Sequence, residues 1–139
     1  MSGYKKHLMV GMVVTCIASL IIFYKGYLPL SFINVAYLLA IAFVFSLLPD
    51  IDIGTSLIRK VILTAFILYL LIYGVGAIGY ILGAAMIIVL FLPHRGIMHT
   101  LLMGALLSGL LWFYFHNIIF PIVAVLNFMS HRVMDGIII

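Results

Sequence analysis

Charged side chains are scarce in this sequence. Only 7% of the 139 residues are charged, and the three acidic residues include no glutamate. A soluble domain carries about a quarter charged residues, so the composition excludes an ordinary soluble protein. The seven basic residues are scattered, and the formal net charge is only +4, which argues against a nucleic-acid-binding patch.

Cysteine and linker segments are also nearly absent. Cys16 is the only cysteine, which excludes an internal disulfide and a cysteine-rich metal site. No low-complexity stretch or repeat divides the chain. The length therefore predicts one integral membrane domain over residues 1–139.

Hydrophobic residues make up 68% of the chain, with a mean hydropathy of +1.43. A membrane-spanning helix needs about 20 apolar residues. The first long run, residues 8–24, follows Lys5 and Lys6 as a signal peptide would. No clear small-residue cleavage site follows it, so we expect a retained transmembrane helix. Further runs cover residues 30–48, 61–92 and 98–115, and a last helix with Pro121 in its first turn runs to the C-terminus.

The 32 residues from 61 to 92 are too long for one comfortable span. The stretch "YGVGAIG" divides them into 61–73 and 75–92. The sequence thus predicts an all-α, polytopic membrane protein with about six transmembrane helices in a compact bundle. Six basic residues then lie on the same face as the N-terminus and only Lys25 lies on the other. The first face should be cytoplasmic, in a multi-pass protein of the inner membrane.

Nearly all remaining ionisable residues share that face. Such groups at membrane depth cost several kcal/mol unless they are paired, which makes them functional candidates. Solvated helix ends are the simpler alternative. The set comprises every acidic residue and four of the five histidines: His7, Asp50, Asp52, His94, His99, His131 and Asp135.

Two spacings indicate metal ligands. His131 and Asp135 are four apart, so they share one helix face and can converge on an ion. A hydrogen-bonded pair without metal is the alternative. Asp50 and Asp52 follow a helix that Pro49 ends, and two nearby carboxylates repel unless a cation intervenes. Their alternative role is to cap a helix that begins near residue 56.

The stretch "HRGIMHT" adds further candidates. His94 and His99 are five apart, so we expect His94 in a loop and His99 in the first turn of a helix. Arg95 is a natural fork for phosphate or carboxylate, with a cytoplasmic anchor as the alternative. Imidazoles and carboxylates without thiolates suit zinc, and also manganese or iron. Such clusters hold one to three ions and hydrolyse phosphate esters.

The segments "KKHL", "LLPDIDIGTS", "HRGIMHTLL" and "SHRVMDGI" resemble the YdjM family, described as inner-membrane metal-dependent hydrolases with a LexA-binding label. The likeness spans nearly the whole chain in the same order. Departures from the family pattern are Ile53 in place of histidine, Met98 in place of threonine and Thr100 in place of serine. The order of ligands is also similar to zinc-dependent phospholipase C and related zinc nucleases.

The resemblance implies a role for each candidate. Asp50 or Asp52, with His99, His131 and Asp135, would form the principal metal site. His7 would serve a second ion that Asp135 could bridge. The other aspartate would orient water or act as general base, which makes Asp52 a catalytic candidate with His94. Arg95 would hold the phosphate.

These observations predict a metal-dependent hydrolase of a phosphoester in a membrane lipid or lipid-linked substrate. A non-enzymatic membrane regulator or scaffold with a structural metal is the alternative. Ion transport predicts ionisable residues deep in the span or on both faces, and it ranks last.

Overall fold

The computed structural model is all-helical over the residues that it describes, which are all except 1–2, 53–55, 75, 92–99 and 137–139. Its elements follow in chain order: α1 (Gly3–Tyr24), α2 (Phe32–Leu47), the short 3₁₀-helix η1 (Leu48–Asp52), α3 (Leu57–Tyr73), α4 (Ala77–Phe91), α5 (Leu101–Phe115) and α6 (Ile119–Met134). The predicted all-α class is therefore confirmed.

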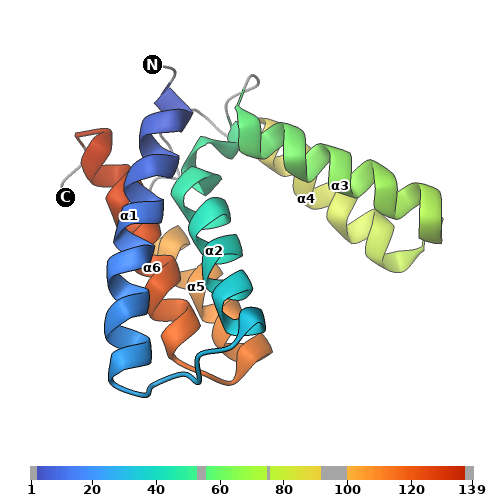
Figure 1. The fold of residues 1–139 in the computed structure, drawn as a ribbon. Coiled ribbons are helices and arrows are strands. Elements are labelled where there is room, and N and C mark those ends of the chain that lie inside the picture. The colour runs from blue at the N-terminus through green and yellow to red at the C-terminus, as the bar shows by residue number, and fades with distance from the viewer. Residues whose placement is uncertain (1–2, 53–55, 75, 92–99, 137–139) are drawn as a thin grey trace.

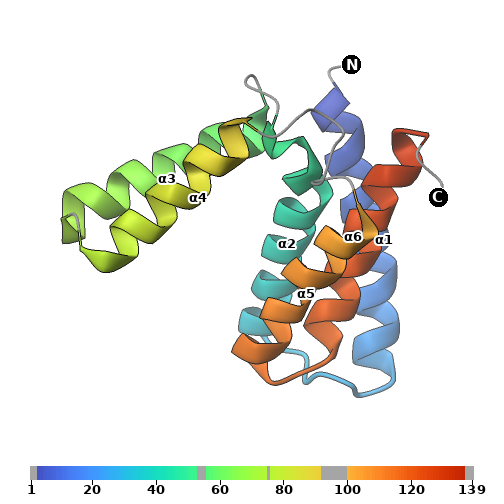
Figure 2. The same ribbon diagram turned by 180° about the vertical axis from the view of Figure 1, so that it is seen from behind.

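Four of the helices form a bundle. α1, α2, α5 and α6 lie side by side, with α6 in contact with each of the other three (Figures 1 and 2). The core between them is built from aliphatic and phenyl side chains, among them Leu38, Phe45, Val123 and Phe128. α1 begins and α6 ends at the same end of this bundle (Figure 1).

The remaining two helices form a hairpin, as the "YGVGAIG" stretch predicts. α3 ends at Gly74, whose φ of +71° is a conformation that glycine adopts without strain. α3 and α4 then run side by side away from the bundle at a wide angle (Figures 1 and 2). The structure therefore differs from the expected compact six-helix bundle, since α3 reaches the core only near its start, at Ile58, and then leaves the bundle together with α4.

Two local features set helix ends. Ser56 is the N-cap of α3, and its Oγ accepts a hydrogen bond from the Arg59 amide. That hydroxyl fills the capping role considered above for Asp50 and Asp52. α6 was expected to reach the C-terminus, but it ends at Met134, and Gly136 follows with a φ of +75°. This expectation was wrong because glycine readily adopts the left-handed conformation that ends a helix.

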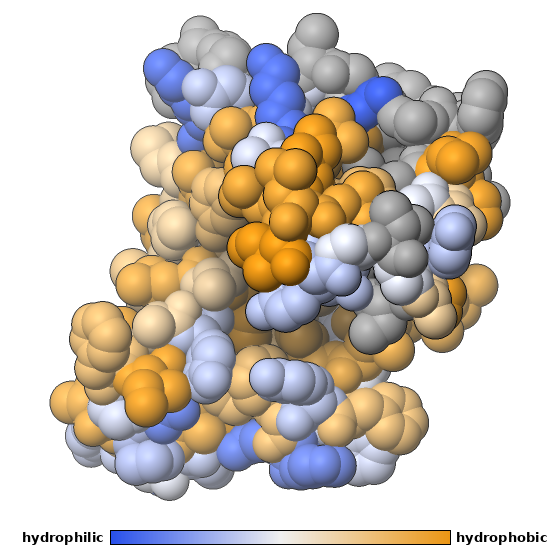
Figure 3. Space-filling model, turned by 90° about the vertical axis from the view of Figure 1, so that its right-hand side faces the viewer, coloured by the Kyte–Doolittle hydropathy of each residue, from blue (hydrophilic) through white to orange (hydrophobic). Residues whose placement is uncertain are grey.

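The surface of the molecule is strongly apolar. Two helical stretches, Gly3–Tyr24 and Phe32–Ile51, are long and apolar enough to cross a membrane. Figure 3 shows hydrophobic side chains over most of one face, with strongly hydrophilic ones gathered at its two ends. Large apolar side chains are exposed on every α-helix, for example Leu20, Phe32, Leu71, Tyr80, Leu102 and Val133. This pattern fits a surface that contacts lipid.

Candidate metal centre

Three elements bring histidine and aspartate side chains together at one end of the bundle. His7 lies in the second turn of α1, Asp50 lies in η1, and His131 lies in the last turn of α6. One ligand atom from each of these three residues lies within 4.8 Å of the other two. Asp135, the C-cap of α6, adds a second carboxylate.

The two carboxylates converge on His131. Its Nε2 atom lies 3.4 Å from Asp50 Oδ1 and 3.2 Å from Asp135 Oδ2. The other oxygen of Asp135 lies 3.3 Å from His7 Nε2. Asp135 therefore joins the two histidines through its two oxygens, and the imidazole rings stack with their centroids 3.9 Å apart.

A contact with the main chain of Ser46 sets the orientation of the His131 ring. Its Nδ1 atom lies 2.7 Å from the main-chain oxygen of Ser46. A carbonyl oxygen can only accept, so Nδ1 carries the proton and donates. In the neutral ring Nε2 is then the atom with the lone pair, and it faces the two aspartates. A histidine that binds metal commonly donates its other N–H to a carbonyl or carboxylate in this way.

Pro49 explains why the Ser46 oxygen is available. Ser46 lies in the last turn of α2, where carbonyl groups have no partner within the helix. In a continued α-helix its oxygen would accept from the amide of residue 50, but Pro49 disrupts the helix here and the chain continues as η1. The residue that ends α2 therefore leaves a carbonyl group for His131.

The distances distinguish two explanations for the cluster. A charge-assisted N–H···O bond is about 2.7–2.9 Å long. Ligand atoms at about 2.0–2.1 Å from a tetrahedral zinc ion lie about 3.4 Å from one another. The three His–Asp separations of 3.2–3.4 Å are close to the second value. One lone pair and two carboxylates facing one point also repel unless a cation lies between them. The donor set thus fits a divalent ion better than it fits direct hydrogen bonds.

Burial strengthens this reading of the site. The side chain of His131 is fully buried, and those of His7, Asp50 and Asp135 are 9%, 13% and 16% exposed. Burying charged groups without compensation is costly, and a shared cation is one way to compensate them.

A buried polar column continues from the centre into the bundle. Asn127, one turn before His131, donates a 2.7 Å hydrogen bond to the Thr15 hydroxyl of α1. Gly11 lies between His7 and Thr15 on the same helix face. A Cβ atom on Gly11 would lie 2.5 Å from Ser46 Cβ and 2.8 Å from Asn127 Oδ1. The absence of a side chain here lets α1, α2 and α6 approach closely enough for their ligands to meet.

The sequence analysis did not predict the residues that support the metal centre from within the bundle. Thr15, Ser46 and Asn127 are each almost fully buried. Asn127 stands one turn before His131, and Thr15 stands two turns after His7, so i, i+4, i+8 spacing on two helices was the signal that could have found them. Ser46 contributes its main-chain oxygen, which every residue type has, so the sequence carries no signal for this contact.

The other predicted site residues are placed only in part. Asp52 ends η1, and its side chain lies outside the described part of the molecule. His94, Arg95 and His99 fall within residues 92–99, which also lie outside the described residues. α5 begins just after them, with Thr100 as its N-cap.

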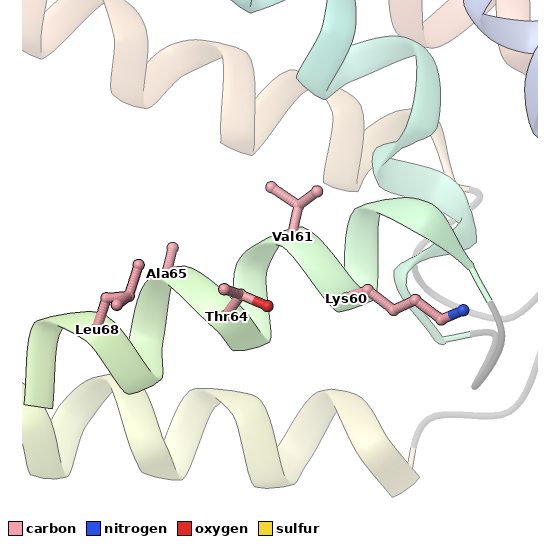
Figure 4. A pocket seen from close by; sticks show the side chains of 5 residues that line it. All are labelled: Lys60, Val61, Thr64, Ala65 and Leu68. Carbon is pink, nitrogen blue, oxygen red and sulfur yellow. The ribbon is translucent and has the colours of Figure 1, made fainter. Parts of the chain in front are cut away.

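An apolar groove of about 360 Å³ lies along α3, on the side that faces the bundle (Figure 4). It is lined by Lys60, Val61, Thr64, Ala65 and Leu68. Lys60 stands at the end of α3 next to η1, which carries Asp50. One end of the groove is therefore basic, and the rest is apolar except for Thr64.

A helical protein with a strongly apolar surface and a buried His/Asp cluster at one end of its bundle fits the class of integral membrane proteins with a candidate metal centre. The chain matches the family model described as YdjM inner membrane protein over residues 1–138, so it belongs to that family. No curated protein and no solved structure matches it.

Proposed function

We propose that this protein is a membrane-embedded, metal-dependent hydrolase of a phosphoester in a lipid or lipid-linked substrate. The observation that carries the proposal is the position of His131, whose Nε2 faces two carboxylates while its Nδ1 is held by the Ser46 carbonyl. His7, Asp50, His131 and Asp135 would hold the ion, for which zinc is the first choice and manganese or iron the alternatives. A divalent ion supplies Lewis-acid activation of water and stabilises the leaving oxygen.

The surrounding residues complete the proposed site. Asp135 holds two imidazoles in a fixed relation, which suits it to bridge two ions. Among the candidates outside the described residues, His99 would be a further ligand and Arg95 would hold the phosphate, with His94 beside it. Asp52, two residues after Asp50, would orient the attacking water or accept its proton.

The groove along α3 supports a substrate with a lipid chain. Its apolar length would take a hydrocarbon chain, and Lys60 would attract an anionic headgroup at the end near η1. A substrate bound in this way would present its polar part toward the bundle end that carries the His/Asp cluster.

The proposed setting is the inner membrane, with the site on the cytoplasmic side. Lys5, Lys6 and Lys60 belong to helix starts at the end of the bundle that carries the cluster, and Lys25 follows α1 at the opposite end. All six helices would be embedded in the bilayer. At about 1.5 Å per residue, α5 and α6 are about 22–24 Å long and would need local bilayer thinning.

A direct assay tests the function. The full-length protein, purified in detergent and loaded with zinc, is incubated with a panel of phospholipids and isoprenyl phosphates while released phosphate or headgroup is measured. We expect turnover of at least one of them, and its loss in His131→Ala with loss of the bound ion. His116→Ala is the control, since His116 is exposed at the far end of α5. Persistent inactivity with metal bound contradicts the proposal.

The burial of His131 supports a second candidate function, that of a membrane regulator or scaffold with a structural metal. The fully buried His131 resembles the closed donor sets of structural metal sites. A membrane regulator or scaffold with a structural ion would keep its metal and show no hydrolysis in the same assay. The panel therefore separates the two functions.

A further inference from the structure

Arg132 is the most unusual cation in the described structure. It directly follows His131, and only 4% of its surface is exposed. Its Nε and Nη1 atoms are buried, and neither finds a hydrogen-bond partner among the residues that the structure describes. A guanidinium carries five N–H donors and stays charged, so burial without partners is strongly unfavourable. An anion from outside the chain would remove this cost.

The helix pattern shows where Arg132 lies. Positions 121, 124, 128 and 132 form one stripe of α6, and all four residues are buried. Phe128 in this stripe packs against α5, since a Cβ atom on Gly104 would lie 2.7 Å from its ring. α5 and α6 are antiparallel neighbours (Figures 1 and 2). One turn beyond Phe128, position 132 therefore stands opposite Thr100, where α5 begins.

Arg132 and the N-terminus of α5 are therefore two neighbouring sources of positive electrostatic potential. The N-terminus of an α-helix carries about half a positive charge, and its first amides point out of the helix. α5 has 15 residues, and the hydroxyl of its N-cap Thr100 accepts a hydrogen bond from the Met103 amide. Arg132 brings a full charge to the position opposite this helix start, one turn beyond the Phe128–Gly104 contact. Phosphate matches both, because its oxygens accept two parallel bonds from a guanidinium and further bonds from helix amides.

We propose that Arg132 and the N-terminus of α5 form a phosphate-binding site beside the His131 metal centre. The ligand is a phosphate group, carried either by a lipid headgroup or by free inorganic phosphate. Its assignment to the substrate or product rests on the proposed hydrolase function, whereas the anion site itself does not.

Phosphate binding tests the site without any need for turnover. Equilibrium dialysis of the zinc-loaded, full-length protein in neutral detergent is carried out with radiolabelled inorganic phosphate. We expect Arg132→Gln to weaken binding by about 10-fold or more, because a charge-assisted hydrogen-bonding group is removed. Arg132→Lys should weaken it by several-fold, since lysine keeps the charge and loses the fork. Arg59→Gln is the control, because it removes the same charge from the start of α3 and should leave binding unchanged.

The results separate the outcomes. Wild-type phosphate affinity in Arg132→Gln overturns the proposal, and so does loss of zinc in that variant, which would mean that Arg132 supports the metal centre instead. Where Arg132→Gln fails to fold, unchanged affinity in Arg132→Lys overturns it. Phosphate binding without hydrolysis of any substrate leaves this site in place and removes the hydrolase. Hydrolysis of a substrate together with wild-type phosphate binding in Arg132→Gln overturns this site and leaves the hydrolase function in place.

Competition identifies the source of the phosphate. Vesicles of phosphatidic acid and vesicles of phosphatidylcholine are each added to the dialysis. Displacement of the labelled ion by phosphatidic acid alone assigns the site to a lipid headgroup. Absence of displacement by both, with inorganic phosphate still bound through Arg132, assigns it to the free ion.

Discussion

The Nδ1 atom of His131 lies 2.7 Å from the main-chain oxygen of Ser46, on a helix 85 residues earlier in the chain. Pro49 ends α2 before the amide of residue 50 can bond to that oxygen in the α-helical pattern, so the residue that ends α2 also orients a candidate ligand on α6. The metal centre therefore depends on a helix end as much as on its own side chains, and this relation can be tested.

Pro49→Ala should weaken metal binding without removing a ligand. Alanine lets α2 continue to residue 50, whose amide then competes with His131 for the Ser46 oxygen. The loss of an orienting partner costs about 10–100-fold in metal affinity. Competition with a chelator of known affinity measures the change. Pro29→Ala, at the opposite end of α2, is the control. Equal affinity in both variants would contradict the orienting role of the Ser46 carbonyl.

Asp135→Asn should release the ion while the fold remains. The substitution keeps the shape of the side chain, but it removes the charge that faces both His7 and His131. Elemental analysis of the purified protein should show at least one fewer equivalent of metal than the wild type. The control is Asn34→Asp, which makes the reverse charge change at the other end of the bundle. Unchanged metal content in Asp135→Asn would exclude this carboxylate as a ligand.

Gly11→Ala should destabilise the bundle and weaken the centre together. The new methyl group would lie 2.5 Å from Ser46 Cβ, so α1 must move away from α2 and α6. Overpacking of this kind costs about 1–3 kcal/mol. Gly109→Ala is a matched control, because nothing lies within 4 Å of its added Cβ atom. Thermal unfolding and metal titration of the two variants measure the effects, and equal stability would contradict the close approach at Gly11.

Thr15→Val should destabilise the protein by about 1–3 kcal/mol, because it leaves the buried Asn127 amide without a hydroxyl acceptor. Thr64→Val, on the exposed α3 groove, removes a hydroxyl without this loss and serves as control. The free energy of unfolding in detergent and denaturant is the measurement. A Thr15→Val variant as stable as the control would mean that the Thr15–Asn127 bond contributes nothing net.

Cysteine labelling in intact cells tests the orientation. In a Cys16→Ser background, Lys25→Cys should react with a membrane-impermeant maleimide added from outside, and Lys60→Cys should react only after permeabilisation. This follows because the two lysines lie at opposite ends of the bundle. Labelling of both positions from the same side would contradict the proposed topology.

The amino-acid sequence determined the membrane class, the all-helical fold and the hairpin break at Gly74. These properties follow from local causes: hydrophobic runs, prolines at helix ends and a glycine that tolerates positive φ. The sequence also indicated that His131 and Asp135 share one face, since four residues make about one helical turn.

Only the tertiary structure decided which helices meet. Residues 7, 50 and 131 are far apart in the chain, and their convergence depends on the packing of α1, α2 and α6 at Gly11. The same packing buries Arg132 and turns the Ser46 carbonyl toward His131. It also leaves α3 and α4 outside the bundle, where hydropathy alone predicts a compact set of six. Hydrophobic runs show that a helix enters the membrane, but complementary side-chain shapes select its neighbours.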